Sequence, residues 1–331
     1  MRVSDILHAE EPHENITVKG WVRTRRDSKS FSFLEINDGS SLKGVQVIVD
    51  SSVPGYDQIE ATSTGASVSI DGKLVESPGK GQKWEVHASS YSLVGTCPDD
   101  YPLQKKGHSP EFLRSIAHLR PRTNLFGAAF RLRSKISYAV HRFFNERGFV
   151  HVHTPIITAS DCEGAGELFR VTTLNGDIDK QPASKDFFGK KTFLTVSGQL
   201  EAETFACGLG NVYTFGPTFR AENSNTTRHA AEFWMIEPEM AFTDLVGDMD
   251  LAEEFVQAMV RTALDECGED LEFFNKFVDK GLIQRLEAVA NTPFERLSYE
   301  DAVNALQKAD KKFEHPVEFG INLQSEHERY L

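Results

Sequence analysis

The chain contains 331 residues, of which 40% are hydrophobic and 26% charged, enough for about two domains with buried cores. Its 36 basic and 49 acidic residues give a formal charge of −13, which excludes a basic coat over the whole surface. The excess is uneven, because residues 244–331 hold 20 acidic and 9 basic side chains. A surface that binds a polyanion is therefore expected within the first 243 residues.

The sequence shows no membrane-spanning or signal segment and no cysteine motif, which excludes several classes of protein. No apolar run approaches the roughly 20 residues of a membrane span, and the acidic N-terminus does not resemble a signal peptide. Four cysteines, far apart in the chain, form no metal-binding knuckle and no disulfide framework: Cys97, Cys162, Cys207 and Cys267. These features predict a cytoplasmic protein with reduced thiols.

Residues 1–98 alternate apolar and polar side chains with the period of half-buried strands. Turn residues at Asn37-Asp38-Gly39 and at residues 77–81 separate the runs. Five short strands in fewer than a hundred residues predict a small β-barrel, for which an OB-fold has the right strand count. The pattern alone fits another small barrel equally well. The predicted strands are 16–22, 31–36, 44–49, 67–75 and 84–94.

A proline-rich segment follows, and residues 99–126 are predicted to form a hinge between two domains. From residue 127 onward the hydrophobic period becomes helical, and Gly148 is placed to end the first helix. Helices mixed with strands predict an α+β domain over residues 127–331. The predicted strands are 149–153, 192–196, 212–219 and 233–241, and the predicted helices are 128–146, 200–207, 248–267, 271–286 and 299–309.

Residues 215–239 carry the strongest chemical signal in the chain. Two predicted strands flank a polar loop, and an antiparallel pairing would bring Arg220 close to Phe233, with Arg228 and His229 at the loop tip. Guanidinium groups bind phosphate oxygens in pairs, and a phenylalanine ring offers a stacking surface for a base. This combination suits a nucleoside triphosphate, although a solvated hairpin with a core phenylalanine fits the pattern about equally well.

This hairpin closely resembles motif 2 of the class II aminoacyl-tRNA synthetases, and residues 149–155 resemble their motif 1. The barrel ahead of them, with Gly20-Trp21-Val22 and Arg25-Arg26-Asp27, resembles the anticodon-binding OB-fold of the aspartyl, asparaginyl and lysyl subgroup. The resemblance covers essentially the whole chain. It implies an OB-fold followed by a class II catalytic domain, in which an antiparallel sheet is flanked by helices.

Within this subgroup the chain is most similar to the asparaginyl family, in residues 154–169, 194–207, 214–239 and 325–331. That family activates L-asparagine with ATP and Mg²⁺ and transfers it to tRNA(Asn). The resemblance implies a homodimer with Pro155 at its interface and no metal ligands within this chain.

The resemblance also assigns the nucleotide-binding residues. Arg220 would hold the α-phosphate of ATP and stabilise the charge that develops during adenylation. Phe233 would stack on adenine, and Arg228 and His229 would meet the distal phosphates or the acceptor end of the tRNA. Glu222 would hydrogen-bond ATP or the tRNA terminus.

The amino-acid pocket is expected around Glu163 and Gln199, which would contact the ammonium group and the bound amino acid. Aspartyl enzymes carry a lysine three residues after this glutamine, where the present chain has Ala202 followed by Glu203. A carboxylate can accept the amide of asparagine but repels an aspartate, because burying the wrong charge costs several kcal/mol. Glu203 is thus predicted to select asparagine, with a solvent-facing position on its helix as the alternative.

A local excess of positive charge marks the barrel, with six basic and three acidic residues between Thr17 and Gln46. Single-stranded RNA is bound by stacking and by hydrogen bonds to base edges on such surfaces. By resemblance, Phe33 would stack on an anticodon base, and Arg26 and Gln46 would contact the central uridine. Phe31 lies on the same strand face as Phe33, so one of the two rings could instead belong to the barrel core.

One departure from the family is large. Its catalytic domains end with motif 3, a glycine-rich strand and a helix with an ATP-binding arginine, and this chain stops at Leu331 without it. The resemblance therefore predicts an N-terminal portion of an asparaginyl enzyme. Two alternatives stay open: a non-catalytic tRNA-binding fragment or regulator, and an aspartyl-type, non-discriminating synthetase.

Overall fold

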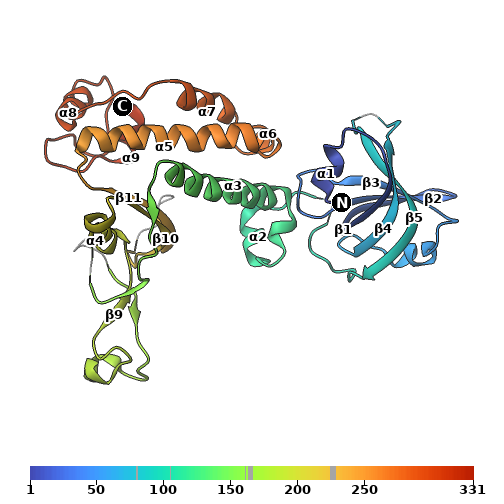
Figure 1. The fold of residues 1–331 in the computed structure, drawn as a ribbon, viewed down its shortest axis with the longest axis horizontal. Helices are drawn as coiled ribbons and strands as arrows, with labels where there is room; N and C mark the ends of the chain where they lie inside the picture. Colours follow the sequence, from blue (N-terminus) through green and yellow to red (C-terminus); the bar gives the residue numbers. More distant parts are fainter. Residues whose placement is uncertain (80, 105, 161, 163–166, 224–228) are drawn as a thin grey trace.

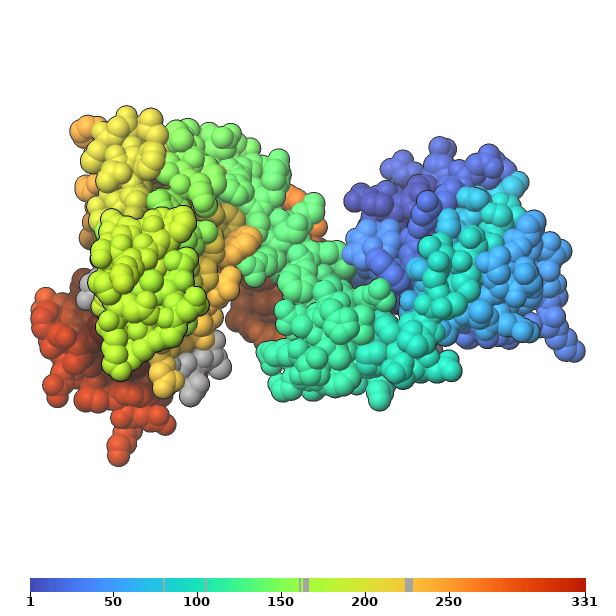
Figure 2. Space-filling view, turned by 90° about the horizontal axis from the view of Figure 1, so that it is seen from below, coloured from blue at the N-terminus to red at the C-terminus, as the bar shows by residue number. Residues whose placement is uncertain are grey.

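The computed structural model describes residues 1–79, 81–104, 106–160, 162, 167–223 and 229–331. A β-barrel lies at one end of the molecule and a mixed helical and stranded part at the other (Figure 1). Residues 99–126, the predicted hinge segment, join them at a narrowing that is visible when the molecule is turned by 90° (Figure 2).

The barrel closes in the order β1-β2-β3-β5-β4, and all five strands predicted for this region are confirmed. Its interior is filled by aliphatic side chains, because alternate residues of each strand point inward. The short helix α1 (Val3–Leu7) buries Val3 and Ile6 against this core. The strands are β1 (His13–Asp27), β2 (Phe31–Asn37), β3 (Val45–Asp50), β4 (Ser67–Glu76) and β5 (Trp84–Gly95), with a 3₁₀ turn at Tyr56–Ala61.

The hinge contains one short helix, α2 (Pro110–Ser115), and a 3₁₀ turn at Arg120–Arg122. Thr123 then caps the long helix α3 (Asn124–Glu146) by accepting a hydrogen bond from the amide of Phe126. The predicted helix over residues 128–146 is confirmed, and Gly148 adopts a φ of 78° just past its end.

The central sheet has the order β11-β10-β6, in which β10 (Asn211–Phe219) and β11 (Glu232–Met240) are antiparallel and β6 (Val150–His151) runs parallel to β10. Helices α3 and α5 (Leu245–Glu266) cover one face of this sheet through an aromatic core around Phe144 and Tyr213. Helix α4 (Gln199–Leu209) packs against β10 and β11. A smaller sheet projects beside it, formed by β7 (Ile157–Thr158), β9 (Thr192–Leu194) and β8 (Arg170–Val171), with 3₁₀ turns at Ile178–Lys180 and Ala183–Lys185.

Two sequence predictions differ from the fold. The strand expected over residues 149–153 is reduced to the two residues of β6, although the amide of Val152 still donates a hydrogen bond of 2.9 Å to the carbonyl of Tyr213 in β10. The single helix expected over residues 271–286 is wrong, because the chain breaks at Gly281, whose φ of 85° no helix interior allows. Asn275 stabilises this break, since its Oδ1 accepts hydrogen bonds from the amides of Gly281 and Ile283.

The remaining helices are α6 (Gly268–Phe277), α7 (Leu282–Asn291), α8 (Tyr299–Gln307) and α9 (Ser325–Tyr330). Helices α6 and α7 pack against α5, and α8 and α9 follow them toward the C-terminus (Figure 1). Among the described residues, no helix is long and apolar enough to cross a membrane.

Candidate active site and barrel surface

Strand β11 separates a structural face from a polar face. Ile236 and Met240 point to the side covered by α3 and α5, where they pack against the aromatic core. Because side chains alternate along a strand, Phe233, Glu237 and Glu239 share the opposite face. A cavity of about 500 Å³ opens on that side, lined among others by Ser197, Gln199, Met235, Glu237 and Glu239.

Arg220 and Phe233 meet at the loop end of this face. Arg220 follows β10 directly, and its amide donates a hydrogen bond of 3.1 Å to the carbonyl of Ala231, which extends the hairpin ladder. Its guanidinium carbon lies 5.6 Å from the centre of the Phe233 ring. The hairpin therefore presents a cation and an aromatic ring together, as the antiparallel pairing predicts.

The other nucleotide-site predictions lie around the same loop. Glu222 and His229 are both exposed, one on each side of residues 224–228. Arg228 falls within that stretch, outside the described residues, and so does Glu163 of the predicted lid.

Glu237 fastens the start of α4 to the sheet. Its carboxylate accepts hydrogen bonds from the hydroxyl of Ser197, the amide of Gly198 at 3.1 Å and the hydroxyl of Thr214 at 2.9 Å. A Cβ on Gly198 would lie 2.6 Å from Thr154 Oγ1, so only glycine fits there. Sequence reasoning missed Glu237, although its period-2 spacing from Phe233 places both residues on one strand face.

Helix α4 carries the predicted specificity residues at its first turns. Gln199 is exposed, and its Nε2 donates a hydrogen bond of 3.0 Å to Glu203 Oε1. Ala202 is completely buried against Val152 and Val212. Glu203 is exposed on the side of α4 that carries Gln199. The surface here therefore presents a carboxylate, and position 202, where aspartyl enzymes carry a lysine, contributes no positive charge.

Carboxylates repel one another on this polar face. Burial raises the pKa of Glu239 to about 7, with the negative charges of Glu203, Glu237 and Asp248 adding to the effect. Near neutral pH this group is therefore partly protonated.

We expect Glu239→Gln to raise the melting temperature at about pH 9 and to change it little near pH 5. The pKa of Glu239 is raised on folding, so its stabilising contribution is complete below the unfolded pKa and is lost as the pH rises through about 7. Glutamine keeps the shape of the side chain without the charge. Thermal unfolding of both proteins across this range tests the expectation, and an equal shift at both pH values would contradict it.

The predicted RNA-binding residues of the barrel lie together on the outer face of three adjacent strands. Arg26 of β1 pairs with Phe33 of β2, and its guanidinium carbon lies 5.5 Å from the ring centre. Phe31 contacts Phe33 edge to face at 5.0 Å, and both rings are partly exposed. Neither ring belongs to the barrel core, because the alternate residues of β2 fill it.

Gln46 of β3 completes this surface and is held in place. Its Nε2 donates a hydrogen bond of 3.2 Å to Glu85. Burial alone would raise the pKa of Glu85, but hydrogen bonds from His87, Ser77 and Gln46 together lower it. A buried carboxylate thus orients the amide of Gln46.

Comparison with known proteins identifies the family. Residues 109–331 match the family described as tRNA synthetases class II (D, K and N), and residues 16–94 match the OB-fold nucleic acid binding domain. An asparagine–tRNA ligase of Nitratidesulfovibrio vulgaris (strain DP4) is 62% identical over 100% of this chain and 73% of its own length. The chain belongs to the asparagine–tRNA ligase family. The OB-fold barrel, the class II domain and the asparaginyl family predicted from sequence are confirmed.

Other members of the asparagine–tRNA ligase family support the same assignment. The ligase of Microcystis aeruginosa (strain NIES-843 / IAM M-2473) is 58% identical over 100% of this chain and 73% of its own length. Asparaginyl-tRNA synthetase from Pyrococcus horikoshii, solved with asparaginyl-adenylate, superposes with a TM-score of 0.81 at 28% identity, over 96% of this chain and 68% of that one.

Proposed function

We propose that this chain activates L-asparagine with ATP and transfers it to tRNA(Asn). The observation that carries the proposal is the placement of Arg220 against Phe233, on the strand face that also bears Glu237 and Glu239. This arrangement offers a nucleotide site beside a polar pocket at the start of α4.

In the first step the asparagine carboxylate attacks the α-phosphorus of ATP, giving asparaginyl-adenylate and pyrophosphate. The nucleophile is already ionised, so the site must position the reactants and stabilise charge rather than remove a proton. Arg220 binds the α-phosphate, Phe233 stacks on adenine, and Arg228 and His229 meet the distal phosphates. Mg²⁺ enters with ATP, as a counterion of its phosphates.

In the second step a ribose hydroxyl at the tRNA terminus attacks the acyl group of the adenylate, and AMP leaves. Glu222 is placed to hydrogen-bond that terminus or the nucleotide. Glu163 and Gln199 hold the amino acid, and Glu203 accepts its side-chain amide. Aspartate is disfavoured because Glu203 and Glu239 would repel its carboxylate.

ATP–pyrophosphate exchange, run in parallel with asparagine and with aspartate, tests this proposal. Exchange that depends on asparagine, and is at least tenfold slower with aspartate, supports it. Equal exchange with both amino acids would favour the aspartyl-type alternative. Exchange with neither, combined with retained tRNA binding, would favour a non-catalytic tRNA-binding protein.

Phe33→Ala is expected to weaken tRNA binding by about 1–3 kcal/mol, the value of one base stacked on an aromatic side chain. Arg26→Ala should weaken it as well, since Arg26 lies over the same ring. Gel-shift titration with tRNA(Asn) measures both effects. The matched control is Phe319→Ala, because Phe319 is 71% exposed far from the barrel in sequence. Unchanged affinity in both barrel variants would refute the assignment of this surface.

We further propose three divisions of the chain: an anticodon-binding barrel over 1–98, a hinge over 99–126 and a catalytic domain over 127–331. Pro155 is assigned to a homodimer interface, which the exposed apolar side chains of Tyr138, Val150 and Ile157 on neighbouring segments support. Sedimentation equilibrium tests the dimer, and cell fractionation tests the cytoplasmic location.

A further inference from the structure

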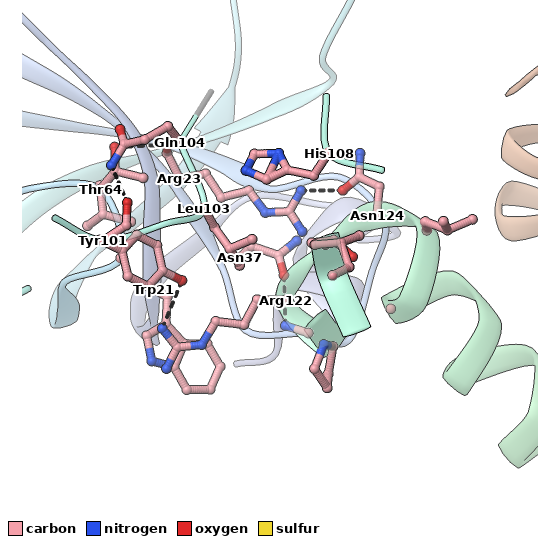
Figure 3. A pocket seen from close by; sticks show the side chains of 18 of the residues that line it. Trp21, Arg23, Asn37, Thr64, Tyr101, Leu103, Gln104, His108, Arg122 and Asn124 are labelled. Carbon is pink, nitrogen blue, oxygen red and sulfur yellow. Dashed lines mark hydrogen bonds between the residues drawn. The ribbon is translucent and has the colours of Figure 1, made fainter. Parts of the chain in front are cut away.

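A second cavity, of about 1050 Å³, lies between the barrel and the hinge and has no role in the chemistry derived above. Its walls come from β1, from the hinge segment and from the first turns of α3 (Figure 3). None of the residues described as lining it belongs to β10, β11 or α4. It is therefore separate from the candidate active site.

Positive charge gathers in this cavity. Arg23, Lys106, Arg122 and Arg131 line it, and Glu35 is the one carboxylate among the lining residues. Arg131 is matched by Asp270, at 2.6 Å. Among the described residues, the side chains of Arg23, Lys106 and Arg122 form no ion pair. Three cations thus face one space, in which Glu35 supplies the one negative charge among the lining residues.

Burial disfavours the charged form of Arg23, one of these cations. Burial lowers the pKa of Arg23; the negative charge of Glu35 opposes this shift, and the positive charge of Arg131 adds to it. Its guanidinium is anchored by a hydrogen bond of 2.5 Å to Asn124 Oδ1, across the junction of barrel and α3 (Figure 3). An anion in the cavity would offset both the desolvation and the repulsion.

Aromatic side chains also line this cavity, and contacts with Arg122 hold them in place. Arg122 lies 4.8 Å from the ring centre of Trp21 and donates a hydrogen bond of 3.2 Å to the hydroxyl of Tyr101. Tyr101 packs against Gly65, where a Cβ would come within 2.8 Å of its ring. Trp21 remains 38% exposed, so its indole offers a flat apolar surface beside the cations.

We propose that this cavity binds a phosphorylated nucleoside, with the phosphate among Arg23, Lys106 and Arg122 and the base against Trp21. Arginine forks bind phosphate oxygens in pairs, and an aromatic side chain beside them provides the stacking surface that a base requires. The volume is ample for one nucleotide.

The nucleotide can come from two sources. It can be free, or it can be part of an RNA that also lies on the outer face of the barrel. The second source has a structural basis, because Glu35 lines the cavity and pairs across the strands with Gln46 of the predicted RNA-binding surface. Residues two apart along a strand lie about 7 Å from one another, so the cavity is only a short step from Phe33.

Calorimetric titration of the full chain with uridine 5′-monophosphate, and separately with inorganic phosphate, tests the proposal. Uridine monophosphate should bind more tightly than phosphate, and Arg122→Gln and Lys106→Gln should each weaken it at least about tenfold. No side-chain contact is described for Lys106, so Lys106→Gln should leave the fold intact, and weaker binding in this variant cannot be attributed to misfolding. Arg114→Gln is the matched control, because Arg114 lies in the hinge outside the cavity.

The same variants separate the two sources in a gel shift with tRNA. The ligand is an RNA nucleotide if the free nucleotide does not bind but Arg122→Gln weakens tRNA binding. In that case the slope of log affinity against log salt concentration should also fall by about one, the value of one phosphate contact. If neither ligand responds to the cavity variants, the proposal is overturned. It is also overturned if nucleotide binding is lost in Phe233→Ala and kept in the cavity variants. These binding measurements do not depend on catalysis, so they test the cavity even if the chain fails to activate asparagine.

Discussion

Replacing Arg220 with glutamine is expected to lower ATP–pyrophosphate exchange with asparagine by about 10²–10³-fold, the cost of removing one preorganised donor from a developing charge. The guanidinium lies 5.6 Å from the Phe233 ring centre, where a stacked adenine would place the α-phosphate close to it. Arg220→Lys should recover only part of this loss, because an ammonium group cannot bind two phosphate oxygens in the same plane.

Arg147 supplies a matched control for Arg220. Its guanidinium also lies over a phenylalanine ring, 3.7 Å from the centre of Phe143, but at the end of α3 and paired with Glu254. Arg147→Gln should leave exchange within about twofold once the folded fraction is accounted for. Similar losses in both variants would mean that Arg220 acts through stability and not through the nucleotide.

Replacing Phe144 with alanine is expected to destabilise the catalytic part by about 3–5 kcal/mol. The ring is fully buried and stacks on Tyr213 at 4.5 Å and on Phe255 at 5.2 Å, joining α3, β10 and α5. Alanine would leave a cavity among three elements that the sheet and helices cannot close. Urea unfolding followed by far-UV circular dichroism measures the loss.

The barrel should unfold independently of this change, because its core shares none of these rings. Tryptophan fluorescence in a Trp234→Phe background reports that separate transition, because the two remaining tryptophans, Trp21 and Trp84, both lie in the barrel. Phe187→Ala is the control, since Phe187 is 74% exposed and should change the unfolding free energy by less than about 0.5 kcal/mol. A loss below about 1 kcal/mol in Phe144→Ala would contradict the assigned role of this core.

Local patterns predicted much of the fold because local physics determines it. The barrel strands follow from period-2 alternation, and the proximity of Arg220 to Phe233 follows from two adjacent strands that must return antiparallel. The prediction of one helix over residues 271–286 was wrong because it rested on apolar spacing alone. This apolar spacing continues through Gly281, whereas the positive φ of Gly281 and the hydrogen bonds that Asn275 accepts from the turn stabilise a break there.

In the candidate site, too, contacts within one hairpin could be predicted from the sequence, and contacts between distant segments could not. The proximity of Arg220 to Phe233 could be predicted because both residues lie within one hairpin, whereas Glu237 contacts Ser197 and Gly198, about 40 residues earlier in the chain. Gln46 is oriented by Glu85 of a strand that is distant in sequence, and the hinge cavity exists only where Arg23 of the barrel reaches Asn124 of α3. Sequence patterns report the secondary structure and the chemistry that neighbouring residues share. Contacts between distant segments are decided when the apolar faces of the barrel, the sheet and the helices pack together, since that packing sets which polar groups must satisfy one another.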